Sequence, residues 1–217
     1  MSTSTLVHIP AGSATIEGML EIPERATGLV LFAHGSGSSR HSPRNNYVAG
    51  VLRQAGVGTL LMDLLTPEED SDYAQRFDIG LLTRRLLEAA RWVGAQEATR
   101  TLPLGFFGAS TGAAAALEAA ALLGRDAVAV VSRGGRPDLA SRETLANMKA
   151  PTLLLVGGWD DGVIDLNQQA YDQLHCEKKL VIVPGATHLF EEPGTLEEVA
   201  RLAAEWFTRH FTPIASD

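Results

Sequence analysis

The chain has 217 residues, 45% of them hydrophobic and 20% charged, which is typical of a single globular domain and unlike a disordered chain. Its 18 basic and 26 acidic residues give a formal net charge of −8, which argues against nucleic acid and an anionic membrane surface as partners. The single cysteine, Cys176, excludes an intrachain disulfide and a cysteine-based metal site. The N-terminal residues lack a signal-peptide pattern and no run is apolar enough to span a membrane, so we expect a cytoplasmic protein.

Short apolar runs alternate with longer amphipathic segments along the chain. The runs with strand-like composition are Thr5–Ile9, Thr15–Ile22, Leu29–Ala33, Gly58–Met62, Leu104–Phe107, Val128–Ser132, Thr152–Val156 and Leu180–Val183. The first two are predicted to form a hairpin through the turn at residues 11–13. The later runs are nearly continuous in aliphatic residues, which is typical of strands buried on both faces of a parallel sheet.

Helices are expected at Asn45–Gln54, Phe77–Val93, Ser110–Leu123, Asp138–Met148, Leu166–Leu174 and Thr195–Phe211. The last of them opens on the capping-box spacing of Thr195 and Glu198. Strands that alternate with helices predict one doubly wound α/β domain over residues 1–217, with a mostly parallel sheet of about eight strands and helices on both faces. Ligands bind beyond the carboxyl ends of the strands in such sheets, so the residues at those ends are the candidates for chemistry.

A serine in a glycine-rich turn follows the strand Leu104–Phe107. The sequence from Gly108 to Gly112 reads G-A-S-T-G, a G-x-S-x-G pattern between a predicted strand and a predicted helix. This pattern holds a nucleophilic serine on a tight turn with its hydroxyl exposed. Ser110 is therefore the candidate nucleophile, and the alternative is a serine that only caps the following helix.

A nucleophilic serine needs a base, and the base needs an acid that orients it. Of the six histidines, only His188 lies just past the final predicted strand. Two neighbouring carboxylates, Asp160 and Asp161, follow the preceding strand and leave the choice of acid open. The alternative interpretation of these residues is a turn aspartate and an incidental loop histidine.

The tetrahedral intermediate of acyl transfer also needs backbone donors for its oxyanion. The N–H of Thr111, directly after the candidate nucleophile, is one expected donor. The glycine-rich turn after Leu29–Ala33 allows a backbone amide to approach a ligand, and the N–H of Ser36 is our choice for the second donor, with Gly35 and Gly37 as alternatives. His34, in the same turn, is expected to be structural.

With these residues in place, the chain resembles the α/β-hydrolase superfamily, and within it the small, lid-free dienelactone hydrolase-like branch. The resemblance rests on Leu31–Gly37, Gly108–Gly112 and Val156–Val163, where a Gly-x-x-Asp-x-x-Val pattern puts the acid at Asp160. It implies hydrolysis of an ester or lactone without a metal or cofactor. Dienelactone hydrolase proper has a cysteine nucleophile where this chain has Ser110, which argues against dienelactone itself as the substrate.

The function predicted from these residues is that of a serine hydrolase, a carboxylesterase or lactone hydrolase, that cleaves small soluble esters through an acyl-enzyme. A thioesterase or amidase with the same residues is one alternative. A non-catalytic binding protein that kept the fold is another, because a fold does not fix a function.

Other residues at the active edge are candidates for substrate contacts. Arg40, Arg133 and Arg136 follow predicted strands, and an arginine there is suited to hold a carboxylate or phosphate of the substrate. The favoured alternative is that these arginines pair with nearby acids and fix loops. Trp159 is expected either to wall the pocket or to pack. About 20 residues separate Ser132 from Thr152, too few for a multi-helix lid, so a shallow and open site is expected.

Overall fold

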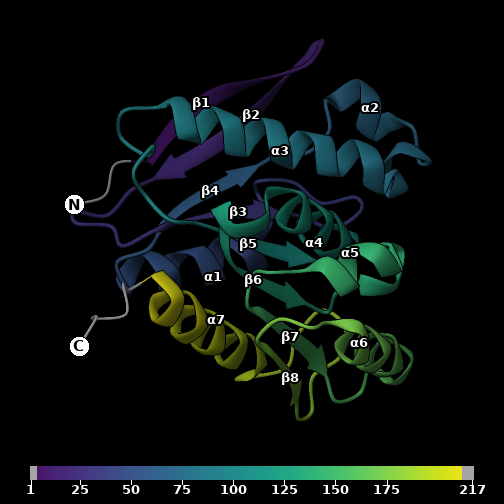
Figure 1. The fold of residues 1–217 in the computed structure, drawn as a ribbon. Helices are drawn as coiled ribbons and strands as arrows, with labels where there is room; N and C mark the ends of the chain where they lie inside the picture. The colour runs from purple at the N-terminus through teal and green to yellow at the C-terminus, as the bar shows by residue number, and fades with distance from the viewer. Residues whose placement is uncertain (1–3, 212–217) are drawn as a thin grey trace.

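The computed structural model describes residues 4–211, and its strands form one eight-stranded sheet in the order β1-β2-β4-β3-β5-β6-β7-β8 (Figure 1). The strands are β1 (Ser4–Ala11), β2 (Ala14–Glu21), β3 (Leu29–Ala33), β4 (Gly58–Met62), β5 (Leu104–Ala109), β6 (Ala127–Arg133), β7 (Thr152–Gly157) and β8 (Lys178–Val183). β2 pairs antiparallel with β1 and with β4, and the pairs from β4 to β8 are parallel. The predicted fold class is confirmed, and each predicted strand run lies in a strand except for Ile22, which follows the end of β2 at Glu21.

The predicted hairpin joins β1 to β2. Ala11 pairs with Ala14 across the turn, and Gly12 lies at a φ of +69°. Glycine adopts this left-handed conformation without steric cost, which explains the residue at this position.

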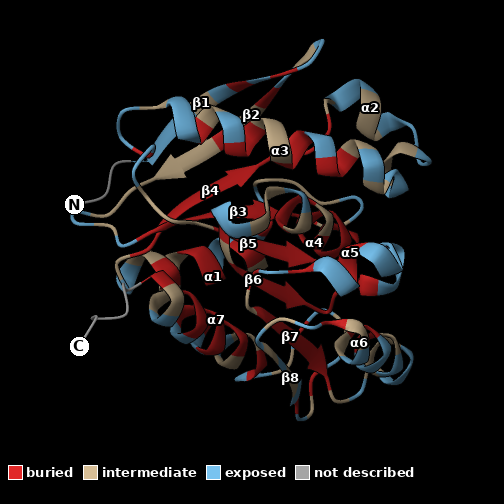
Figure 2. Ribbon diagram, in the orientation of Figure 1, coloured by how far each residue is buried: buried red, intermediate tan, exposed pale blue. Residues whose placement is uncertain are grey.

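Helices cover both faces of the sheet (Figure 1). They are α1 (Pro43–Gln54), α2 (Pro67–Ser71), α3 (Ile79–Ala95), α4 (Thr111–Leu123), α5 (Arg142–Asn147), α6 (Asp161–Gln173) and α7 (Thr195–Phe211). α1 and α7 pack against one face, and α3, α4, α5 and α6 against the other. β3, β4 and β7 are therefore buried along their whole length, as the red strands in Figure 2 show. Burial on both faces explains the continuous apolar runs of the sequence.

Two helix predictions were wrong in their extent. The segment Asp138–Met148, expected as one helix, is a short 3₁₀ turn (Pro137–Leu139) followed by α5. The chain restarts there because the Ser141 hydroxyl caps α5 by accepting the N–H of Thr144. α6 begins at Asp161 and not at Leu166, so the two aspartates after β7 lie at a helix start.

Two N-terminal caps also differ from expectation. Thr195 and Glu198 do not form the expected capping box, because Thr195 is already the first residue of α7 and its hydroxyl donates to the Glu192 carbonyl. A capping box does exist at α2, between Thr66 and Glu69, and this helix was not predicted.

The described helices include none long and apolar enough to cross a membrane. Between β6 and β7, where a lid would be inserted, the chain holds the 3₁₀ turn and the six-residue α5. The carboxyl ends of the parallel strands meet at one edge of the sheet (Figure 1). The candidate residues follow these ends.

Candidate active site

Ser110 lies on a strained turn between β5 and α4. Its φ is +50° and its ψ is −121°, a conformation that side-chain-bearing residues rarely adopt. The surrounding glycines make the turn possible. A Cβ on Gly108 would lie 2.4 Å from Cα of Ala113, and one on Gly112 would lie 2.3 Å from the Ala33 carbonyl oxygen. α4 therefore crosses β5 and β3 at a distance that only glycine permits at these two positions.

The Ser110 side chain does not cap the helix that it precedes. It makes no capping hydrogen bond, although it occupies the N-cap position of α4. The backbone of Ser110 is fixed, because its N–H donates to the Arg133 carbonyl (3.3 Å) and its carbonyl accepts the N–H of Arg136 (3.1 Å). The geometry thus disfavours the helix-cap interpretation and leaves the hydroxyl on a rigid, strained support.

His188 and Asp160 form a pair at the same edge of the sheet. Nδ1 of His188 lies 2.6 Å from Oδ2 of Asp160, and the two side chains are 37% and 17% exposed. The neighbouring Asp161 is exposed and starts α6. The structure thus joins Asp160, and not Asp161, to the histidine. Because Nδ1 faces the carboxylate, Nε2 is the ring nitrogen left for a second partner.

The loop that carries His188 is held close to the end of β7. A Cβ on Gly157 would lie 2.4 Å from the Ala186 carbonyl oxygen, so this glycine permits the approach. The N–H and the hydroxyl of Thr187 both donate to the carboxylate of Glu192 (3.0 and 2.6 Å). These contacts fix the residue before His188.

Ser110 and His188 border the same turn. The Ser110 N–H is bonded to Arg133, and a Cβ on the next residue, Gly134, would lie 3.6 Å from Cε1 of His188. The sheet order puts β5, β6, β7 and β8 side by side, and the loop after β8 reaches the end of β6, where the His188 carbonyl oxygen would lie 3.1 Å from a Cβ on Gly134. The three residues predicted from strand ends therefore converge at one edge.

The expected oxyanion donors are neighbours. The N–H of Ser36, in the loop after β3, donates to Oγ1 of Thr111 (3.0 Å). Thr111 begins α4, so its own N–H has no acceptor within the helix. The Thr111 N–H is thus free of helical hydrogen bonds, whereas the Ser36 N–H is already bonded to the side chain of Thr111.

Both ring nitrogens of His34 face backbone groups. Its Nδ1 lies 2.9 Å from the Gly35 carbonyl oxygen, and its Nε2 accepts the N–H of Leu64 (3.0 Å). Burial lowers the pKa of His34 below 6.5, which favours the neutral ring that this pattern requires. The residue is structural, as expected from the sequence.

Two of the three arginines that were candidates for substrate contacts are paired with acids. The guanidinium of Arg40 contacts Asp63 and Glu17, and the backbone N–H of Arg40 donates to the Asp63 carboxylate (2.7 Å). Arg136 makes a bidentate contact with Asp138 (2.8 and 2.7 Å). These ion pairs favour the alternative that Arg40 and Arg136 hold loops in place over the expectation that they bind substrate. Arg133 has no carboxylate partner among the described residues.

Trp159 lies directly before Asp160 and is 68% exposed. The backbone N–H of Trp159 donates to the Ala186 carbonyl (2.9 Å), which ties Trp159 to the loop of His188. An indole so exposed does not pack in the core. Its position agrees with the expectation that Trp159 walls the site.

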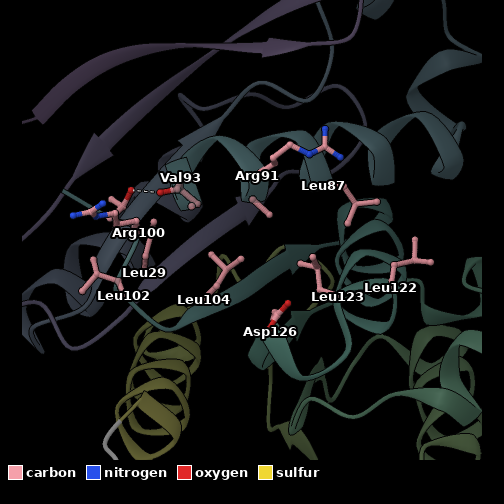
Figure 3. A pocket seen from close by; sticks show the side chains of 13 residues that line it. Leu29, Leu87, Arg91, Val93, Arg100, Leu102, Leu104, Leu122, Leu123 and Asp126 are labelled. Atoms are coloured by element: carbon pink, nitrogen blue, oxygen red, sulfur yellow. Dashed lines mark hydrogen bonds between the residues drawn. The ribbon is translucent and has the colours of Figure 1, made fainter. Parts of the chain in front are cut away.

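A cavity of about 580 Å³ lies away from these residues, between α3 and α4 (Figure 3). Leucines from both helices line it, and Leu29 and Leu104, the first residues of β3 and β5, form its floor. It is therefore at the amino edge of the strands, opposite the Ser110 turn.

Two residues that shape the site could not be found from a sequence pattern. Glu192 holds Thr187, as described above. Phe190 is fully buried at a φ of +55° and packs beside Gly134, so it anchors the loop of His188. Neither belongs to a motif, and their roles depend on contacts that exist only in the folded chain.

No family model matches the chain. Among solved structures, a dienelactone hydrolase from Anabaena variabilis is 55% identical, with a TM-score of 0.93, over 96% of this chain and 98% of that one. A lid-free α/β serine hydrolase from Xanthomonas campestris is 21% identical, with a TM-score of 0.79, over 98% and 97% of the two chains. This second likeness shows the fold.

A curated relative from Mycobacterium tuberculosis is 57% identical over 204 residues, which are 94% of this chain. It is described as a "Putative phosphoribosyl transferase". The match covers 46% of that protein, so the present chain spans about half the length of this relative.

The Anabaena dienelactone hydrolase thus matches this chain over nearly the whole length of both proteins, at high sequence identity and with the same overall fold. The chain is thus a hydrolase of the α/β type, and it belongs to the dienelactone hydrolase family.

Proposed function

We propose that this protein is a serine esterase that hydrolyses small soluble carboxylic esters or lactones through an acyl-enzyme. The observation that carries the proposal is the Ser110 turn. Its strained backbone presents a hydroxyl without a capping bond, beside the loop that holds the His188–Asp160 pair. Backbone strain of this kind persists where the surrounding structure enforces it, and it is common at active sites.

In the proposed mechanism, Oγ of Ser110 attacks the ester carbonyl carbon while Nε2 of His188 takes the hydroxyl proton. Asp160 accepts the Nδ1–H of His188, which fixes the tautomer and stabilises the imidazolium. The imidazolium then returns the proton to the leaving alcohol as the carbon–oxygen bond breaks. Water, deprotonated by the same histidine, releases the acid and regenerates the serine.

The N–H groups of Thr111 and Ser36 are the proposed oxyanion donors. The position of Thr111 at the start of α4 adds the positive end of the helix dipole to this site. The Ser36 N–H must leave Oγ1 of Thr111 to serve, and a charged oxygen is a stronger acceptor than a hydroxyl.

The substrate expectation follows from the connections between strands. The segment between β6 and β7 is too short to cover the site, so small esters are favoured over long-chain lipids. Trp159 is the proposed wall of the acyl pocket, because it is exposed beside Asp160.

Other chemistries remain as alternatives with the same residues. Thioester and amide hydrolysis use the same nucleophile, and substrate screens separate them from ester hydrolysis. Phosphoribosyl transfer, suggested by the name of the mycobacterial relative, is the weaker candidate, because the site described here lies in a segment that is less than half of that protein.

The test is covalent labelling combined with turnover. A fluorophosphonate probe should label the wild type and not Ser110→Ala, while Ser13→Ala, at the exposed hairpin tip, should label normally. Ser110→Ala and His188→Ala should each lower kcat on p-nitrophenyl esters by roughly three or more orders of magnitude, with a double variant hardly worse, because such residues act as a unit. Labelling or near-normal turnover in Ser110→Ala would refute the assignment.

A further inference from the structure

A groove runs between α3 and α4, away from the proposed active site. It consists of the cavity of about 580 Å³ shown in Figure 3 and a second hollow of about 490 Å³ nearer the carboxyl edge of the sheet. Leu87 of α3 and Leu122 of α4 line both hollows and so form the ridge between them. Leu122 is 67% exposed. A large apolar side chain that stands in water beside two hollows marks a surface for docking.

The two walls of this groove carry opposite charges. On the α3 wall, Arg84 lines the second hollow and Arg91 lines the cavity. On the α4 wall, Glu118 lines the second hollow, and Asp126, just past the end of α4, lines the cavity. Figure 3 shows Arg91 and Asp126 on opposite sides of the cavity. Each hollow therefore has a cation on one wall and an anion on the other.

These four charged groups are available to a partner molecule. Arg84 and Asp126 make no ion pair within residues 4–211. Arg91 pairs with Glu88 of its own helix, but its side chain is 73% exposed, and an ion pair so accessible to water is weak. Glu118 accepts two hydrogen bonds, both from uncharged groups, so its negative charge is not neutralised by them.

The direction of the two helices makes this face complementary to itself. Each helix leads from the carboxyl end of one parallel strand to the amino end of the next, so α3 and α4 run in the same direction. A twofold axis that lies between two copies and is parallel to these helices brings α3 of one copy against α4 of the other, with their ends in register. Arg84 then faces the partner's Glu118, at the level of the second hollow. Arg91 faces the partner's Asp126 at the level of the cavity, and Leu122 enters the partner's groove.

We propose that the groove between α3 and α4 is the interface of a symmetric homodimer, in which α3 of each copy packs against α4 of the other. The charge of the groove suits a second copy. With Arg100, three cations and two anions line it, so two copies repel each other less at this face than the net charge of −8 implies for the whole chain.

The size of this face predicts how tightly the two copies bind. The 17 residues of α3 and the 13 of α4 form helices about 25 and 20 Å long, which side by side present roughly 500 Å² per copy. The two copies together approach about 1,000 Å², the lower limit for a specific interface. A reversible dimer with a micromolar dissociation constant is therefore expected. Its formation does not depend on the proposed esterase function.

The first test measures self-association. Sedimentation velocity of the wild-type chain from about 1 to 100 μM should show a concentration-dependent equilibrium of monomer and dimer. Leu122→Glu should raise the dissociation constant by roughly 100-fold or more, because each dimer would bury two carboxylates in place of two leucines. Leu6, on the edge strand β1, is 47% exposed, so Leu6→Glu is the matched control and should leave the constant unchanged. Equal melting temperatures of the monomeric proteins show that both variants fold.

The second test uses an exchange of charge to check which residues face each other. Arg91→Glu or Asp126→Arg alone brings like charges together across the interface, twice in each dimer, and should raise the dissociation constant by roughly 10-fold or more. The double variant Arg91→Glu/Asp126→Arg should return the constant close to the wild-type value, because opposite charges face each other again. Lys179→Glu, at an exposed position of β8, makes the same change of net charge as Arg91→Glu and should have little effect.

Three results would overturn the proposal. A wild-type chain that stays monomeric over the whole concentration range has no such interface, and fluorescence of 1-anilinonaphthalene-8-sulfonate that is lost in Leu122→Glu would then assign the groove to a small apolar ligand. A dimer that is equally stable in Leu122→Glu uses another face of the molecule. A double charge variant no better than the single ones would reject the packing of α3 against the partner's α4.

Discussion

Replacing Ser110 by glycine is expected to give a more stable protein than replacing it by alanine. Both changes remove the hydroxyl, which makes no capping bond. Only glycine also relieves the backbone, because Ser110 has a φ of +50°.

The magnitude follows from two opposing terms. A residue held in such a conformation stores about 1–3 kcal/mol of strain, which glycine removes. Glycine gains about 0.4–1 kcal/mol of additional conformational entropy in the unfolded chain, which lowers stability. The net gain of Ser110→Gly over Ser110→Ala is therefore about 0.5–2 kcal/mol, or roughly 1–8 °C in melting temperature for a domain of this size.

Thermal and urea unfolding of the two variants, followed by circular dichroism, measure the difference. Both variants are expected to lack activity, so the comparison reports stability alone. The control pair is Ser13→Gly and Ser13→Ala in the hairpin turn, where the serine φ is not positive and glycine should bring no gain. A Ser110→Gly variant no more stable than Ser110→Ala would show that the turn is unstrained and would remove the main support for the nucleophile.

Three further predictions concern the acid, the buried histidine and the substrate. Asp160→Asn should lose far more activity than Asp161→Asn, by roughly 10⁴-fold where an amide imposes the wrong histidine tautomer, and a reversed ranking in esterase assays would assign the acid to Asp161. His34 has a folded-state pKa below its unfolded value of 6.5, so stability is full above pH 6.5 and falls as the pH drops below it. The free energy of unfolding should thus decline less between pH 6.5 and 5 in His34→Gln than in the wild type, and parallel curves in urea titrations would contradict this. Rates on p-nitrophenyl esters of two to sixteen carbons should be highest for short chains without a rise at the micellar transition, and a long-chain maximum would indicate a lipase.

The sheet was predictable because its signal is local. β3 and β4 were predicted at their observed bounds, since a strand buried on both faces must be apolar at every position. β8 was predicted from Leu180 but begins at Lys178, because this lysine satisfies its ammonium by donating to the Tyr171 and Leu174 carbonyls. In the sequence, a charged residue such as Lys178 gives no indication that a strand begins there.

The candidate site was predictable to the extent that it follows strand ends. Ser110 was predicted from its G-x-S-x-G turn and His188 from its place after the final strand. The residues alone left Asp160 and Asp161 open, the family resemblance favoured Asp160, and the structure adds the contact of Asp160 with His188. The arginines needed it even more. Arg40 contacts an acid 23 residues away, and Arg133 contacts Asn45 from 88 residues away, so no local pattern distinguishes the satisfied guanidinium from the unsatisfied one.

The hydrogen bond from the Ser36 N–H to Oγ1 of Thr111 has a consequence for selectivity between ground state and transition state. In the proposed mechanism, the resting enzyme already satisfies this amide, so a substrate must compete with an internal acceptor. A neutral ester carbonyl is a weak competitor, whereas the anionic oxygen of the tetrahedral intermediate is a strong one. The Ser36 N–H therefore leaves Thr111 for the substrate oxygen as negative charge develops on that oxygen. The new hydrogen bond lowers the activation barrier of the reaction without tightening the binding of the unreacted ester. The Thr111 hydroxyl thus keeps the Ser36 N–H hydrogen-bonded until the oxygen of a reacting substrate displaces it.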